Sequence, residues 1–113
     1  MKQVVAFIRP SKEDAVCQAL HGITGVSGAS FTDIRGFGRG RHDRSRRDLD
    51  EAVVGSLPQL RVDVMVTAAG VDQVVKAIVD HAHTGNRGDG KVYVVPLESA
   101  VRISTRESGP SAV

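Results

Sequence analysis

The chain has 113 residues, of which 41% are hydrophobic and 25% charged, and its formal net charge is +2. These values predict one soluble domain with a small core, and no apolar run approaches the roughly 18 residues that a membrane-spanning helix needs. The near-balanced charge argues against a dedicated nucleic-acid binder, while a lone cysteine excludes an internal disulfide and a cysteine-based metal site. We therefore expect a cytoplasmic protein without a signal peptide or a metal site.

The predicted elements follow a concealed duplication. Residues 4–20 align with residues 62–78 without a gap, and each unit consists of a β-rich run, a short break and a helix. A further strand is predicted after each helix, at residues 26–35 and 91–95. This βαβ-βαβ order predicts an α+β, ferredoxin-like fold, in which two helices cover one face of a four-stranded antiparallel sheet. A short edge strand is also expected at residues 100–103.

Helix ends and faces follow from local chemistry. Pro10 ends the first strand, Ser11 is the expected N-cap of the first helix, and Gly85 is the expected C′ residue after the second. The predicted apolar helix faces consist of Val16, Ala19 and Leu20, and of Val71, Val74, Val75, Ile78, Val79 and Ala82. Because these faces cover only one side of the sheet, we expect another subunit to cover the other.

Two glycine-flanked turns each end in a cation. They are Gly36-Phe37-Gly38-Arg39 and Gly88-Asp89-Gly90-Lys91, and each lies at the end of a predicted strand. Glycine lets backbone N–H groups approach a ligand closely, and the following Arg or Lys supplies positive charge. Together the turns predict a site for a phosphorylated small molecule.

A long charged loop, residues 37–57, separates the second and third predicted strands. Its first half holds five arginines and one acidic residue and its second half three acidic residues, so it buries too little apolar surface to order itself. Since packing alone would favour a shorter connection, we interpret the loop as a protein-binding segment. Its expected contact residues are Arg41, Arg44, Arg46, Arg47, Leu49, Val53 and Val54.

These motifs resemble the PII signal-transduction protein family. The matching stretches are residues 6–10 (AFIRP), 33–39 (DIRGFGR), 57–58 (LP), 82–93 (AHTGNRGDGKVY) and 100–107 (AVRISTRE). The resemblance covers nearly the whole chain and implies a single PII-like domain over residues 1–113 that forms a homotrimer. It also implies nucleotide sites between subunits, a long T-loop over about residues 37–57, and a flexible C-terminal tail over about residues 105–113.

The resemblance also implies the residues of the nucleotide site. Their counterparts in the family surround the ligand, and Arg102 is expected to reach in from the neighbouring subunit. They are Phe7, Ser30, Gly36, Phe37, Gly38, Arg39, Asp63, Met65, Gly88, Asp89, Gly90, Lys91 and Arg102. The implied ligand is ATP or ADP, and AMP competes because Ser104 stands where the family usually has a second arginine.

Three departures limit what the resemblance implies. Gly40 and Gln59 stand where typical members have the glutamine and lysine that help to hold magnesium and 2-oxoglutarate. We therefore do not expect 2-oxoglutarate sensing, and the role of Mg²⁺ stays open. Tyrosine uridylylation is not expected either, because the single tyrosine, Tyr93, belongs to a predicted strand.

The implied function is that of an adenine-nucleotide-sensing regulator of a target protein, a membrane transporter or a metabolic enzyme, without membrane insertion of its own. One alternative is a basic-loop nucleic-acid binder, although no aromatic residue accompanies the arginines for base stacking. The other is an acyl-phosphate-hydrolysing enzyme, for which only fold analogy speaks. We expect no catalysis, because no recognisable motif places a Ser-His-Asp or Cys-His pair. His81 and His83 point about 200° apart on a helix, so they do not chelate one ion.

Overall fold

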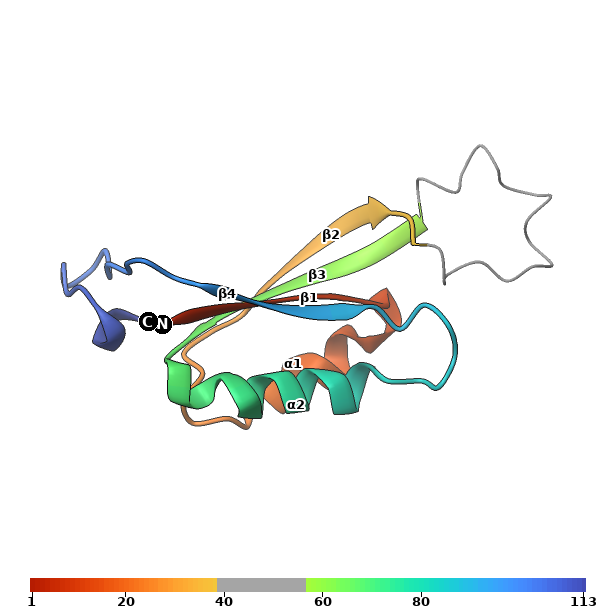
Figure 1. The fold of residues 1–113 in the computed structure, drawn as a ribbon, viewed down its shortest axis with the longest axis horizontal. Helices are drawn as coiled ribbons and strands as arrows, with labels where there is room; N and C mark the ends of the chain where they lie inside the picture. The colour runs from red at the N-terminus through yellow and green to blue at the C-terminus, as the bar shows by residue number, and fades with distance from the viewer. Residues whose placement is uncertain (39–56) are drawn as a thin grey trace.

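The computed structural model describes residues 1–38 and 57–113, which form one antiparallel sheet and two α-helices. Figure 1 shows the sheet as one layer, with both helices on the same side of it. No helix in these two ranges is long and apolar enough to cross a membrane. The elements are β1 (Lys2–Ile8), the 3-10 helix η1 (Pro10–Lys12), α1 (Glu13–His21), β2 (Ser30–Gly36), β3 (Leu57–Val66), η4 (Ala68–Gly70), α2 (Val71–Ala82), β4 (Lys91–Pro96) and η5 (Pro110–Ala112).

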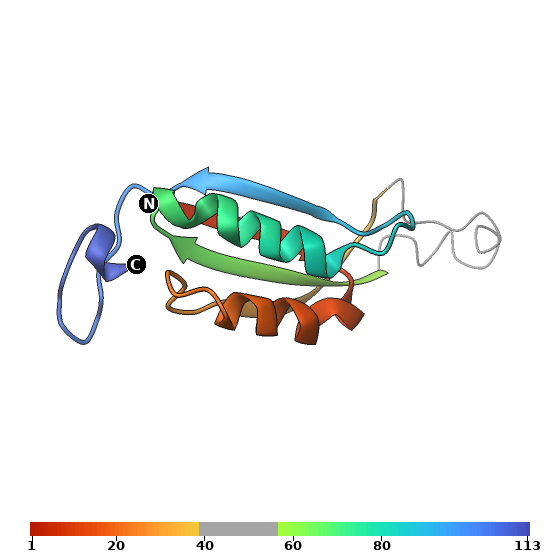
Figure 2. The ribbon, with the colours of Figure 1, turned by 90° about the horizontal axis from the view of Figure 1, so that it is seen from below.

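The strand order is β2-β3-β1-β4, and all neighbouring strands are antiparallel. The predicted ferredoxin-like fold is therefore confirmed. Seen from the helix side, α1 and α2 lie side by side across the sheet (Figure 2). Strand β1 pairs with β3 on one side and with β4 on the other. In this register Phe7 lies opposite Arg61 on β3 and opposite Lys91 on β4.

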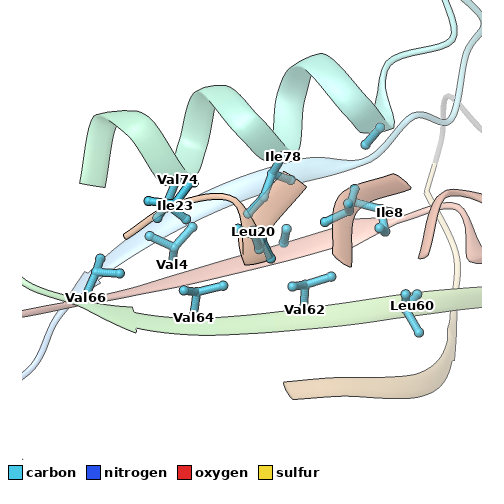
Figure 3. Packing of buried hydrophobic residues seen from close by; sticks show 13 residues of the cluster. Val4, Ile8, Leu20, Ile23, Leu60, Val62, Val64, Val66, Val74 and Ile78 are labelled. Carbon is cyan, nitrogen blue, oxygen red and sulfur yellow. The ribbon is translucent and has the colours of Figure 1, made fainter. Parts of the chain in front are cut away.

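The core lies between the helices and one face of the sheet (Figure 3). Alternate strand residues point into it, as Val4 does on β1 and Val62 on β3, and both are fully buried. From α2, Val74 and Ile78 complete the layer, spaced four residues apart on one helix face. Each such side chain contributes about 1.5–3 kcal/mol by its burial, so the core depends on aliphatic side chains in place of aromatic ones.

Several local predictions were wrong. Ser11 is not an N-cap: it lies within η1, α1 begins two residues later, and no side chain caps either element. Val79 is 48% exposed, so the apolar face of α2 is narrower than predicted. α2 ends at Ala82 with His83 as its C-cap, so Thr84 occupies the C′ position and Gly85, the predicted C′ residue, follows it, although its φ of 88° does favour glycine.

Strand boundaries also shifted. β2 begins at Ser30 and not at residue 26. The predicted edge strand at residues 100–103 consists of a single bridge between Val101 and Ser108. The segment 105–113, expected as a flexible tail, makes backbone hydrogen bonds back to this bridge, including one of 3.0 Å from the Gly109 amide to the Ala100 carbonyl. Its flexibility stays a prediction.

Candidate functional site

A cleft of about 750 Å³ lies at the end of the sheet where the two glycine turns meet. In Figure 1 the turn before β4, the end of β2 and the start of β3 all lie at this end of the molecule. The cleft is lined by Phe7, Phe37, Gly38, Gln59, Asn86, Gly88, Asp89, Gly90, Lys91 and Tyr93. The fold thus brings the two turns, about fifty residues apart in the sequence, to one surface.

One wall of the cleft is aromatic and follows from the sheet register. Phe7 and Tyr93 contact edge to face, with ring centroids 6.1 Å apart and planes at 77°. The Cζ atom of Arg61 lies 6.0 Å from the centroid of the Phe7 ring, at the outer range of a cation–π contact. Lys91 pairs with Phe7 in the β1–β4 ladder, so the start of β4 places its cation beside this wall.

The second glycine turn has a backbone that only glycine accepts easily. Gly85, Gly88 and Gly90 have φ values of 88°, 92° and 102°. At Gly90 a Cβ atom would lie 1.7 Å from the carbonyl oxygen of Phe7, so the turn packs directly on the backbone of β1. At this turn the wall of the cleft is therefore formed in part by the glycine main chain.

The Asp89 carboxylate holds this turn together. Its Oδ2 atom accepts hydrogen bonds from the backbone N–H of Thr84 at 2.8 Å and of Gly85 at 3.3 Å. Its Oδ1 atom accepts from the Thr84 hydroxyl and, at 3.2 Å, from Nε of Arg9. The Thr84 bonds, and then that from Arg9, hold the pKa of Asp89 well below its usual range. Asp89 is thus an anion whose two oxygens are directed at the turn itself.

The two histidines of the α2 C-terminus contact different groups. His83 places Nδ1 3.3 Å from Oδ2 of Asp89, whereas His81 places Nδ1 2.8 Å from the Ala77 carbonyl of its own helix. Across residues 1–38 and 57–113, no group of three His, Cys, Asp or Glu side chains could hold a metal ion.

The remaining predicted site residues in the described ranges do not line the cleft. Gly36 ends β2 next to the cleft, where a Cβ atom would lie 2.9 Å from Oε1 of Gln59. Ser30 and Asp63 are register partners on β2 and β3, and neither they nor Met65 line the cleft. Arg102 belongs to the C-terminal segment, which leaves the opposite end of the sheet (Figure 1). One chain alone therefore does not assemble all the predicted site residues.

Asp63 has partners within its own chain. It accepts bonds from Arg61 Nε at 2.9 Å and Nη2 at 3.0 Å, and from Gln3 Nε2 at 3.0 Å. The Arg61 bonds lower the pKa of Asp63, while partial burial opposes them. This network lies on the face of the sheet away from the helices, because its residues alternate with the core positions of β1 and β3.

Other predicted residues lie outside the described ranges. They are Arg39 and the expected partner-binding residues Arg41, Arg44, Arg46, Arg47, Leu49, Val53 and Val54.

The residues that sequence reasoning missed are Asn86, Tyr93 and Arg9. Tyr93 could have been found, since it follows Lys91 by two residues and so shares its strand face. Arg9 had no local signal, because its partner Asp89 is 80 residues away in the chain.

The elements and the strand order define a small ferredoxin-like α+β domain with a cleft at one end of its sheet. The profile of the family described as Nitrogen regulatory protein P-II matches residues 1–107. Proteins named Nitrogen regulatory protein P-II are 42% identical in Microchaete diplosiphon and 40% identical in Azospirillum brasilense and Haemophilus influenzae, each over the full length of both chains. The chain therefore belongs to the nitrogen regulatory protein P-II family, and it is a signal-transduction protein and not an enzyme.

Proposed function

We propose that the protein binds an adenine nucleotide in this cleft and thereby regulates a target protein. The observation that supports the proposal is the meeting of the two glycine turns with the Lys91 ammonium in one cleft. Main-chain N–H groups and a cation suit a chain of phosphates, and a cleft of this volume suits a ligand of nucleotide size. ATP, ADP and AMP all fit this chemistry.

The proposal includes a homotrimer in which each cleft is completed by a neighbour. Ser30, Asp63, Met65 and Arg102 do not line the cleft of their own chain, so they would have to serve that of another subunit. The uncovered sheet face supports such an assembly, because Met65, Tyr93 and Val95 are 38%, 49% and 42% exposed there.

The neutral side chain of Gln59 bears on whether the protein senses 2-oxoglutarate. Gln59 is only 7% exposed and lines the cleft, where a lysine would offer an ionic contact to a carboxylate ligand. An amide cannot supply that charge. We therefore propose that 2-oxoglutarate is not sensed in the manner usual for the family, while a role for Mg²⁺ stays open.

The regulatory step we propose is a shift between conformations of the segment that begins at Arg39, directly after the cleft residue Gly38. A nucleotide shifts that equilibrium only by its different affinity for the two states, and the proposed target, a membrane transporter or a metabolic enzyme, binds one of the two states better. The proposed contact residues of this segment are Arg41, Arg44, Arg46, Arg47, Leu49, Val53 and Val54.

Isothermal titration with ATP, ADP and AMP, with and without Mg²⁺ and 2-oxoglutarate, tests the proposal. Lys91→Met should weaken binding at least tenfold, because a charge-assisted contact to phosphate is worth about 1.5–3 kcal/mol. Lys76→Met is the matched control, since Lys76 pairs with Asp80 on the outer surface of α2. No heat with any nucleotide would refute the proposal, and light scattering that showed a monomer would refute the trimer.

A further inference from the structure

The turn of residues 84–90 is tied to the end of β1 at two points. Gly90 packs against the Phe7 carbonyl, and Arg9 reaches Asp89 with Nε at 3.2 Å. Arg9 also donates from Nη2 to the backbone carbonyl of Arg87. One guanidinium therefore contacts both the side chain and the main chain of the turn.

We propose that Arg9 is a positioning residue of the nucleotide site, which acts through Asp89 and does not contact the ligand itself. This inference rests on the proposed nucleotide function of the cleft. The Arg9–Asp89 pair fixes the glycine turn in the shape that presents its N–H groups, and it neutralises a carboxylate that would otherwise repel phosphate.

The first argument is that the backbone of Arg9 is held in place. It lies between the buried end of β1 and Pro10, whose ring fixes the backbone that follows. Its carbonyl accepts a hydrogen bond of 3.0 Å from the Lys12 amide, and the preceding Ile8 is buried. The guanidinium thus extends from a fixed point, and its planar fork directs one N–H group at Asp89 and another at the Arg87 carbonyl in a fixed geometry.

The second argument is charge. Asp89 lines the cleft and is 23% exposed, so its negative charge lies at the surface that would face phosphate. Its oxygens already accept bonds from Thr84, Gly85 and Arg9, so the carboxylate is committed to the turn. Without Arg9, the Asp89 carboxylate would lack the charge of the guanidinium and would repel an anionic ligand. This repulsion would add to the effect of a less ordered turn on ligand affinity.

The third argument is that Arg9 should affect the conformation of the turn far more than the stability of the fold. Arg9 is 34% exposed, and ion pairs at that exposure contribute little to folding. Loss of the Arg9–Asp89 pair should therefore leave the urea midpoint of unfolding almost unchanged, whereas the conformation of the turn and the affinity for nucleotide should both change.

The experiment compares wild type with Arg9→Lys, Arg9→Gln, Asp89→Asn and the double variant Arg9→Gln/Asp89→Asn by titration with ADP. We expect Arg9→Gln to weaken binding about tenfold, and the double variant to bind several-fold better than Arg9→Gln because the uncompensated charge is gone. Arg9→Lys keeps the charge but not the fork, so it should fall between wild type and Arg9→Gln. Lys12→Gln, which removes a neighbouring cation without touching Asp89, should bind as wild type does.

A second measurement needs no ligand. The amide NMR signals of Gly85, Gly88 and Gly90 report the turn directly, and Arg9→Gln should shift them and speed their hydrogen exchange while the urea midpoint stays near that of wild type. A double variant no better than Arg9→Gln would show that repulsion by an uncompensated Asp89 does not weaken binding, and it would overturn the inference. Unchanged glycine signals in Arg9→Gln would overturn it as well. If the wild type binds no nucleotide, the proposed function fails, and the glycine signals alone then decide whether Arg9 holds the turn.

Discussion

Replacement of Gly90 by alanine should be among the most damaging single changes near the cleft. The new Cβ would lie 1.7 Å from the Phe7 carbonyl oxygen and 2.8 Å from its carbon, where real Cβ contacts are essentially never closer than 3.0 Å. The backbone would have to move by more than 1 Å, at the point where Lys91 pairs with Phe7 in the ladder. The φ of 102° adds strain for any residue with a Cβ.

The expected loss can be separated into two parts. Left-handed strain costs about 1–2 kcal/mol, and forced displacement of packed backbone costs about 1–3 kcal/mol, so Gly90→Ala should lower the free energy of unfolding by about 2–5 kcal/mol. Gly85→Ala is the matched control, because its φ of 88° imposes similar strain while its Cβ would meet nothing within 4 Å. It should lose only the first part.

Urea denaturation at one fixed protein concentration gives both values, and the fixed concentration matters because assembly adds to the measured stability. Titration with ADP supplies a second readout, in which Gly90→Ala should lose most of its affinity. If the two alanine variants lost the same free energy, the close approach between Gly90 and β1 would not be what shapes the turn.

Two further predictions concern the core and the pH dependence. Ile78→Ala, at a fully buried position, should lower the free energy of unfolding in urea by about 2–5 kcal/mol. Val79→Ala, at a site 48% exposed, should lower it by less than about 1 kcal/mol. Similar losses in the two variants would mean that Val79 is covered, as the sequence predicted. The pKa of Asp89 is depressed in the fold, chiefly by the Thr84 bonds, so its stabilisation is complete above its ordinary pKa and is lost as the pH falls towards the folded value. The urea midpoint should therefore fall more steeply between about pH 5 and pH 2 in wild type than in Asp89→Asn, and parallel curves would contradict this role of the carboxylate.

Periodicity along the chain predicted most of the fold. The alternation in β1 and β3 and the three-to-four spacing in α2 are local signals, and burial of one face is the physical reason that such patterns persist. The prediction failed where neighbouring structure overrides local preference. The Ser11 cap gave way to the 3-10 turn over Pro10–Lys12, and Val79 lies at the edge of α2, where no strand covers it fully.

The features of the site were likewise predicted from the sequence only in part. The glycines of the two turns and the cations that end them, Arg39 and Lys91, were visible in the sequence, because positive φ and phosphate charge both require particular residue types. Asp89 was predicted as a ligand contact, and this stays a prediction: Asp89 lines the cleft, while its oxygens accept hydrogen bonds from Thr84 in the turn and from Arg9 at the end of β1.

The sequence by itself determined the order of elements, the helix-facing side of the sheet and the chemistry of the glycine turns, since each depends on residues close together in the chain. Only the tertiary structure decided which distant residues meet. The β1–β4 register brings Lys91 beside Phe7, and the 80-residue separation between Arg9 and Asp89 closes only when that ladder forms. It also separated the C-terminal segment, which contains Arg102, from the cleft: β4 begins at Lys91 beside the cleft and runs to Pro96, so the chain leaves β4 at the other end of the sheet (Figure 1).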